Sequence, residues 1–254
     1  MAWRQWLPLD LPASSAEQTI DADPPWRPSD TLIGVLLTLV PLVGLSLISQ
    51  STPATAAATP PDAVNAFSIL ISTAILEGIF LIAPLYYAHR AGGQAWLQSL
   101  GIRKLNAGLA IGLFLLAAMA TVIADYAYDG IVSAFHLSVQ TNADHLEHQL
   151  RHMPLTLDAT LLGAVLIAPI CEELFFRGFL LQGLRAVMST PWAVVVSSLI
   201  FAAAHADLGS FPLLLVLGLL MGTLRVLTRS IWPGVALHTF NNLLTAFFLL
   251  TTLH

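Results

Sequence analysis

The chain alternates between long apolar runs and short polar segments, and seven of the runs could cross a membrane as helices. A helix needs about 20 consecutive apolar residues to span a bilayer. The fifth and sixth runs are short for this, which favours either little tilt or flanking re-entrant turns. The seven runs cover approximately Thr31–Ser49, Phe67–Ala88, Leu105–Tyr126, Thr160–Leu181, Trp192–Ala206, Phe211–Leu227 and Ile231–Leu253.

Composition agrees with this pattern. Of the 254 residues, 56% are hydrophobic and only 10% are charged, whereas a soluble domain carries about 25% charged residues. The fold class predicted is therefore all-α: a polytopic transmembrane helical bundle of about seven spans, or eight helices if a surface helix is added. The single cysteine, Cys171, excludes a disulfide framework within the chain.

The polar segments divide the chain into four parts. Residues 1–30 form a polar arm, 31–128 hold the N-terminal spans, 129–158 form a long outer loop, and 159–254 form a C-terminal helical core. The arm lacks the apolar core and cleavage site of a signal peptide, so we expect the first span to serve as an uncleaved signal-anchor.

Basic residues set the expected orientation, because cytoplasmic loops are enriched in Lys and Arg. The loops on the opposite side hold only Arg151. We therefore expect a cytoplasmic N-terminus and an outer C-terminus in a bacterial inner (plasma) membrane. The loops on the expected cytoplasmic side hold Arg4, Arg27, Arg90, Arg103, Lys104, Arg185, Arg225 and Arg229.

The outer loop contains a histidine-rich segment, DHLEHQLRHM. His145, His148 and His152 follow at i, i+3 and i+7, which places them on one face of a helix. An amphipathic surface helix is the favoured interpretation, and a metal-binding or pH-sensing patch is the alternative.

The fourth apolar run carries Glu172, Glu173 and Arg177 within the stretch APICEELFFRGF. A charge at the centre of a bilayer costs about 2.5–3.5 kcal/mol on insertion scales, so ionisable residues there are functional candidates. Glu173 and Arg177 are spaced i, i+4 and can pair on one face. Glu172 projects about 100° away, which leaves it available for chemistry.

Two further runs bring polar groups to a similar depth. His205 ends the fifth run, and His238 and Asn242 lie i, i+4 on one face of the seventh, with Asn241 pointing elsewhere. Helical rise of about 1.5 Å per residue is compatible with one site near mid-bilayer. An isolated histidine or asparagine in a span is more often an interhelical hydrogen-bonding group than a catalytic one.

A carboxylate with two imidazoles suits either of two mechanisms. Glu172, His205 and His238 could hold zinc or another divalent metal, which activates a bound water. Alternatively Glu172 could itself act as general base, with Asn242 and one histidine stabilising the oxyanion. Glu77 and Asp125 also lie in apolar runs, where local pairing is favoured over a functional role. Cys171 is expected to be an inert buried thiol.

These residues resemble the CPBP family of membrane proteases, also called the Abi or CAAX-protease family. Its pattern of E-E-x-x-x-R, F-x-x-x-H and H-x-x-x-N on three helices reads here as Glu172 to Arg177, Phe201 to His205, and His238 to Asn242. The resemblance covers about Leu161 to the C-terminus. It implies an endopeptidase with Glu172 as the catalytic glutamate, completed by His205, His238 and Asn242, and a need for Glu173 and Arg177.

The sequence thus predicts an intramembrane endopeptidase acting on a membrane-associated or CAAX-like substrate. The expected partners are membrane lipid and a peptide or membrane-protein substrate, with no nucleic acid; the oligomeric state is left open. A non-enzymatic scaffold or bacteriocin-immunity protein with the same polar core is the main alternative. A transporter with a Glu172–Glu77 proton relay is disfavoured because the chain shows no inverted repeat.

Overall fold

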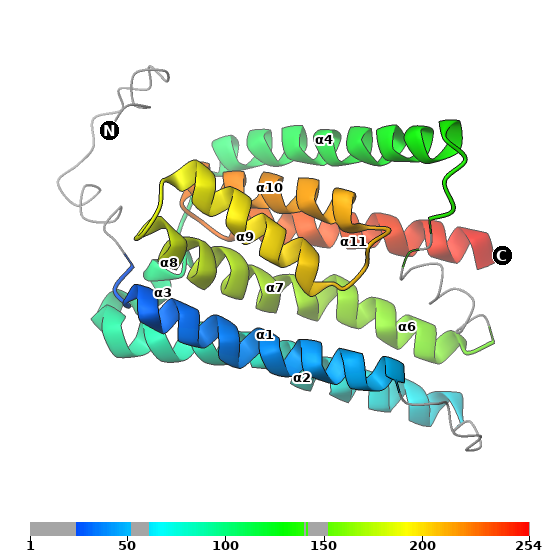
Figure 1. The fold of residues 1–254 in the computed structure, drawn as a ribbon, viewed down its shortest axis with the longest axis horizontal. Coiled ribbons are helices and arrows are strands. Elements are labelled where there is room, and N and C mark those ends of the chain that lie inside the picture. Colours follow the sequence, from blue (N-terminus) through cyan, green and yellow to red (C-terminus); the bar gives the residue numbers. More distant parts are fainter. Residues whose placement is uncertain (1–23, 52–60, 140, 142–151, 254) are drawn as a thin grey trace.

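The computed structural model describes residues 24–51, 61–139, 141 and 152–253, and within these ranges the chain is helical with no strand. The long helical rods lie roughly side by side (Figure 1). The first three rods are α1 (Pro28–Ser51), α2 (Asp62–Gly92) and α4 (Ala107–Ala134), with the short η2 (Gly93–Ala95) and α3 (Trp96–Ser99) between α2 and α4. The fourth rod is continuous and consists of α6 (Pro154–Leu162), η3 (Gly163–Ile167), α7 (Ala168–Glu173), η4 (Leu174–Leu180) and α8 (Leu181–Arg185). The last three rods are α9 (Thr190–Ala204), α10 (Phe211–Thr228) and α11 (Trp232–Leu253).

Six of these rods are long and apolar enough to cross a membrane, and α9 is a shorter apolar helix of 15 residues. The all-α polytopic bundle predicted from the sequence is confirmed. Of the histidine-rich segment, His145 and His148 lie outside the described residues, and His152 is exposed just before α6.

The fourth rod begins earlier than its apolar run, at Pro154 instead of near Thr160. Asp62 at the start of α2 explains the extra turns: its carboxylate accepts hydrogen bonds from the backbone N–H groups of Leu155 and Thr156, both at 2.9 Å, and from the Thr156 hydroxyl at 2.6 Å. A carboxylate on another helix thus satisfies two of the N–H groups that a helix start leaves without partners.

We expect Asp62→Ala to lower the free energy of unfolding by about 0.5–2 kcal/mol, the usual loss when a helix cap is removed. Thermal unfolding of purified protein in detergent measures this. Asp158→Ala, at an exposed position on α6, is the matched control. An equal decrease in both variants would contradict the capping role.

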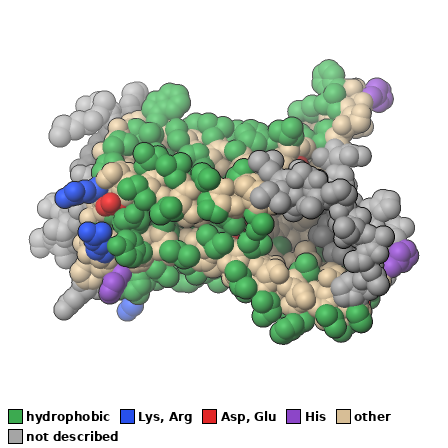
Figure 2. Space-filling view, turned by 60° about the horizontal axis from the view of Figure 1, so that its bottom comes forward, with side chains coloured by type: hydrophobic (Ala, Val, Ile, Leu, Met, Phe, Trp, Pro, Cys, Tyr) green, Lys and Arg blue, Asp and Glu red, His purple; other side chains and the backbone are tan. Residues whose placement is uncertain are grey.

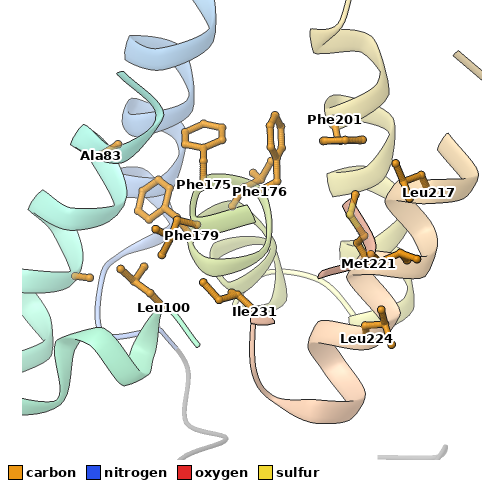
Figure 3. Close-up of a cluster of buried hydrophobic side chains, with 14 of the residues drawn as sticks. Ala83, Leu100, Phe175, Phe176, Phe179, Phe201, Leu217, Met221, Leu224 and Ile231 are labelled. Carbon is orange, nitrogen blue, oxygen red and sulfur yellow. The ribbon is translucent and has the colours of Figure 1, made fainter. Parts of the chain in front are cut away.

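An aromatic cluster from η4 forms the centre of the bundle. Phe175, Phe176 and Phe179 are each no more than 1% exposed, and they pack against side chains from α1, α2, α9 and α10 (Figure 3). Phe176 is edge-on to Phe201 of α9, with ring centroids 5.2 Å apart. The cluster fixes the position of the rod that carries the glutamate pair.

Candidate active site

Glu172 and His205 face each other across the junction of α7 with the end of α9. The Glu172 Oε2 and His205 Nε2 atoms are 3.9 Å apart. The Glu172 side chain is 11% exposed and the His205 side chain is 29% exposed. The His205 ring, which directly follows α9, is therefore reachable from outside the protein, whereas the Glu172 Oε2 atom within the fourth rod is enclosed.

The tautomer of the His205 ring follows from the hydrogen bond that its Nδ1 atom makes. Nδ1 lies 2.8 Å from the Phe201 carbonyl oxygen, and since a carbonyl only accepts, Nδ1 must donate. In a neutral imidazole Nε2 then carries a lone pair, and it is this lone pair that faces the Glu172 carboxylate. Two acceptors 3.9 Å apart suit a donor placed between them, such as a water molecule.

Glu173 points away from Glu172 and pairs with Arg177. The Glu173 Oε1 and Arg177 Nη1 atoms are 2.7 Å apart, and the two side chains are 0% and 1% exposed. Arg177 also donates from Nη2 to the Gly218 carbonyl at 3.3 Å, and its guanidinium lies 4.3 Å from the centre of the Phe201 ring. This buried pair connects α7 and η4 to α10 and α9.

His238 on α11 lies against Glu173. Its Nδ1 atom is 3.7 Å from Glu173 Oε1, and its side chain is 3% exposed. The sequence predicts instead one pocket shared by His238, Glu172 and His205. In the structure the Phe201 ring packs against both histidines, with centroids 4.7 Å from His205 and 5.6 Å from His238.

Gly234, one turn before His238, accounts for this arrangement. A Cβ atom at residue 234 would lie 2.6 Å from Glu173 Oε2, so the missing side chain is what lets the carboxylate lie against α11. The Glu173 carboxylate can lie between His238 and Arg177 because residue 234 has no side chain to occupy this space. Sequence reasoning missed Gly234, for which the signal was a glycine on the α11 surface one turn before the motif histidine.

We expect Gly234→Ala to lower the free energy of unfolding by about 1–3 kcal/mol, the usual cost of overpacking a core, and to reduce any activity of the site. Thermal unfolding and an activity assay on the same preparation measure the two effects. Gly112→Ala is the control, because a Cβ there meets no atom within 4 Å. Wild-type behaviour of Gly234→Ala would contradict the close packing of Glu173 on α11.

Asn242 is held by the backbone of the fourth rod. Its side-chain amide donates to the Ala164 carbonyl at 2.7 Å, and Thr239 donates to the Val165 carbonyl at 3.3 Å. Pro169 provides the reason: in this π-helical stretch the N–H of Ala168 donates to the Gly163 carbonyl five residues earlier, and the proline that follows has no N–H to donate to the Ala164 carbonyl. The π-helical stretch η3 thus presents carbonyls to α11, and Asn242 uses one of its two N–H groups there.

Glu77 on α2 lies near this site as well. Glu77 and Glu172 are close enough for their charges to interact, and the Glu77 Oε2 atom is enclosed without a hydrogen-bond partner. Asp125 on α4 instead has Asp129 as its acidic neighbour. Cys171 is buried beside the glutamates.

The residues expected to hold a metal do not converge. Within the described ranges no three His, Cys, Asp or Glu side chains are placed to share a metal ion, because His238 faces Glu173 while only His205 faces Glu172. This arrangement of donors does not fit the predicted three-ligand centre.

Residues 154–244, which are 91 of the 254 residues, match the family model described as Type II CAAX prenyl endopeptidase Rce1-like. Comparisons with curated proteins and with solved structures give no match. The matched segment contains every residue of the three motifs but excludes Glu77. The resemblance to the CAAX-protease family is thus confirmed, and it lies in residues 154–244 of this membrane protein, which are similar to the Rce1-like type II CAAX prenyl endopeptidases.

Proposed function

We propose that this protein is an intramembrane endopeptidase in which Glu172 activates the water that cleaves the peptide bond. The observation that carries the proposal is the Glu172–His205 pair, 3.9 Å apart and partly accessible in an otherwise closed helical core. The similarity of residues 154–244 to a peptidase family supports hydrolysis over a purely structural role for this pair.

In this mechanism Glu172 and His205 both bind one water molecule and have different roles. Glu172 Oε2 takes a proton from the water, whose oxygen bonds to the carbonyl carbon of the substrate. His205 Nε2 accepts the other O–H and orients the attack. When the C–N bond breaks, Glu172 returns its proton to the leaving nitrogen, and the water oxygen remains in the new carboxyl group.

The remaining motif residues have supporting roles in this scheme. Asn242 has a second amide N–H beyond the one bonded to Ala164, and we assign it to the oxyanion of the tetrahedral intermediate. Glu173, Arg177 and His238 fix the rotation of the fourth rod, so that Glu172 faces His205. The substrate we propose is a membrane-associated or CAAX-like chain.

Hydrolysis by purified protein in detergent tests the proposal. A fluorescence-quenched CAAX-type peptide, with and without a farnesyl group, serves as probe, and mass spectrometry in ¹⁸O-water identifies the cleaved bond. Because His205 orients the water, His205→Ala is expected to lower kcat by about 10²–10⁴-fold, the usual contribution of acid–base catalysis. His152→Ala, at an exposed position, is the control.

Two results would count against the proposal. Equal cleavage by His205→Ala and wild-type protein would remove the histidine from the mechanism. Loss of activity on chelation, restored by a stoichiometric metal found by elemental analysis, would replace the glutamate route with the metal route.

A further inference from the structure

The active site is closed toward one end of the bundle. Beyond Glu172 in the direction of α8, the aromatic cluster fills the space between the rods (Figure 3). The side chains in this layer are no more than 3% exposed; they are Leu100, Phe175, Phe176, Phe179, Leu217, Met221, Leu224 and Ile231. No substrate chain can reach Glu172 through this layer without displacing it.

Toward the opposite end of the bundle, His205 directly follows α9, in the connection to α10. The two helices stop well before the far ends of α4, α6 and α11 (Figure 1), and α9 has 15 residues, so it is only about 22 Å long. His205 lies at its end, 29% exposed. Three residues further, the Leu208 side chain is 91% exposed. Access to the pair is therefore from the side of the Ala204–Phe211 connection.

Basic residues are gathered at the closed end. On the face shown in Figure 2, the Lys and Arg side chains lie at one end, next to a broad apolar surface. In the described part of the chain, every Lys and Arg except the buried Arg177 lies beside the start of α1, α4 or α11 or the end of α2, α8 or α10. These termini form one end of the bundle, which the enrichment of cytoplasmic loops in basic residues assigns to the cytoplasm.

Depth along the rods agrees with this direction. Glu172 is 13 residues before Arg185 and Glu77 is 13 residues before Arg90, so both carboxylates lie about 20 Å from the basic end. In a hydrocarbon core about 30 Å thick, this leaves them about 10 Å below the other surface. The catalytic pair is thus nearer the outer side.

We propose that the active site receives its substrate from the extracytoplasmic side of the membrane. This rests on the proposed function and specifies its substrate class: a membrane-anchored chain whose scissile bond lies in the outer half of the bilayer or just outside it. A chain presented from the cytoplasm would meet the closed aromatic layer.

Cysteine labelling in intact cells tests the direction independently of catalysis. The buried Cys171 is the protein's only native cysteine, so Leu208→Cys and Lys104→Cys each add one exposed thiol at opposite ends. We expect a membrane-impermeant maleimide to label residue 208 in intact cells and residue 104 only after permeabilisation, with wild-type protein as the blank. The reverse pattern would overturn the proposed direction.

A second experiment tests the opening itself. Attaching a maleimide-linked polyethylene glycol to Leu208→Cys in detergent is expected to block most cleavage of the quenched peptide, whereas the same attachment to Lys104→Cys leaves cleavage unchanged. Full activity of the residue 208 conjugate would overturn the placement of the opening. If unmodified wild-type protein cleaves no peptide, the proposed function fails, while the labelling result still decides the orientation.

Discussion

Glu172→Gln is expected to abolish peptide cleavage while the protein still inserts and folds. The amide keeps the size of the side chain but cannot take a proton from water. We therefore expect kcat to fall by at least the roughly 10²–10⁴-fold that a general base contributes. Stability should be equal to wild type or higher, because a carboxylate on a side chain that is only 11% exposed is replaced by a neutral group. The measurement is kcat with thermal unfolding on the same sample.

Glu77→Gln is the matched comparison for this variant. It makes the same chemical change at the same depth in the membrane, on the neighbouring α2, and our mechanism assigns no proton to Glu77. We therefore expect Glu77→Gln to retain cleavage. An equal loss in both variants would favour a shared proton relay and contradict a mechanism with one general base.

Arg177→Met is expected to lower the free energy of unfolding by about 3–5 kcal/mol, the usual effect of removing one partner of a buried ion pair. The Glu173 carboxylate, 0% exposed, would keep the His238 ring at 3.7 Å but would lose the arginine cation that neutralises it. Thermal unfolding in detergent measures the change. Cleavage should also fall, because the pair holds α7 in the rotation that directs Glu172 to His205.

Two comparison variants separate lost pairing from lost packing. The double variant Glu173→Gln/Arg177→Met removes both charges, and we expect it to recover part of the lost stability, which gives a favourable coupling energy in a double-mutant cycle. Arg185→Met removes an arginine that donates to Gln182 at 3.0 Å in a partly buried setting and should cost little. No difference between Arg177→Met and Arg185→Met would contradict the importance of the buried pair.

The seven rods and the pairing of Glu173 with Arg177 follow from local rules, which is why the sequence predicts them well. Apolar length predicts a span, and i, i+4 spacing predicts which side chains meet on one helix. The helix start at Pro154 does not follow from local rules, because its cap comes from Asp62, 93 residues away from Leu155. Helix ends completed by another helix have no local signal.

The partner of His238 also depends on tertiary structure. Spacing predicts that His238 and Asn242 lie on one face of α11, but it does not predict which glutamate that face contacts. Packing of Glu173 into the space left by Gly234 decides it. Likewise, Asn242 is bound to the Ala164 carbonyl because Pro169 disturbs the opposite helix, a relation between two segments far apart in the sequence.

The central claim is that Glu172 hydrolyses peptide bonds of a membrane substrate, and comparison of protein termini in cells tests it most directly. Membranes from cells producing wild-type protein or Glu172→Gln at equal levels would be compared by mass spectrometry of N- and C-terminal peptides. We predict at least one membrane-anchored protein that is cleaved with wild-type protein and accumulates uncut with Glu172→Gln. Identical sets of termini in the two membranes, together with equal cleavage of the quenched peptide by the two purified proteins, would contradict the claim.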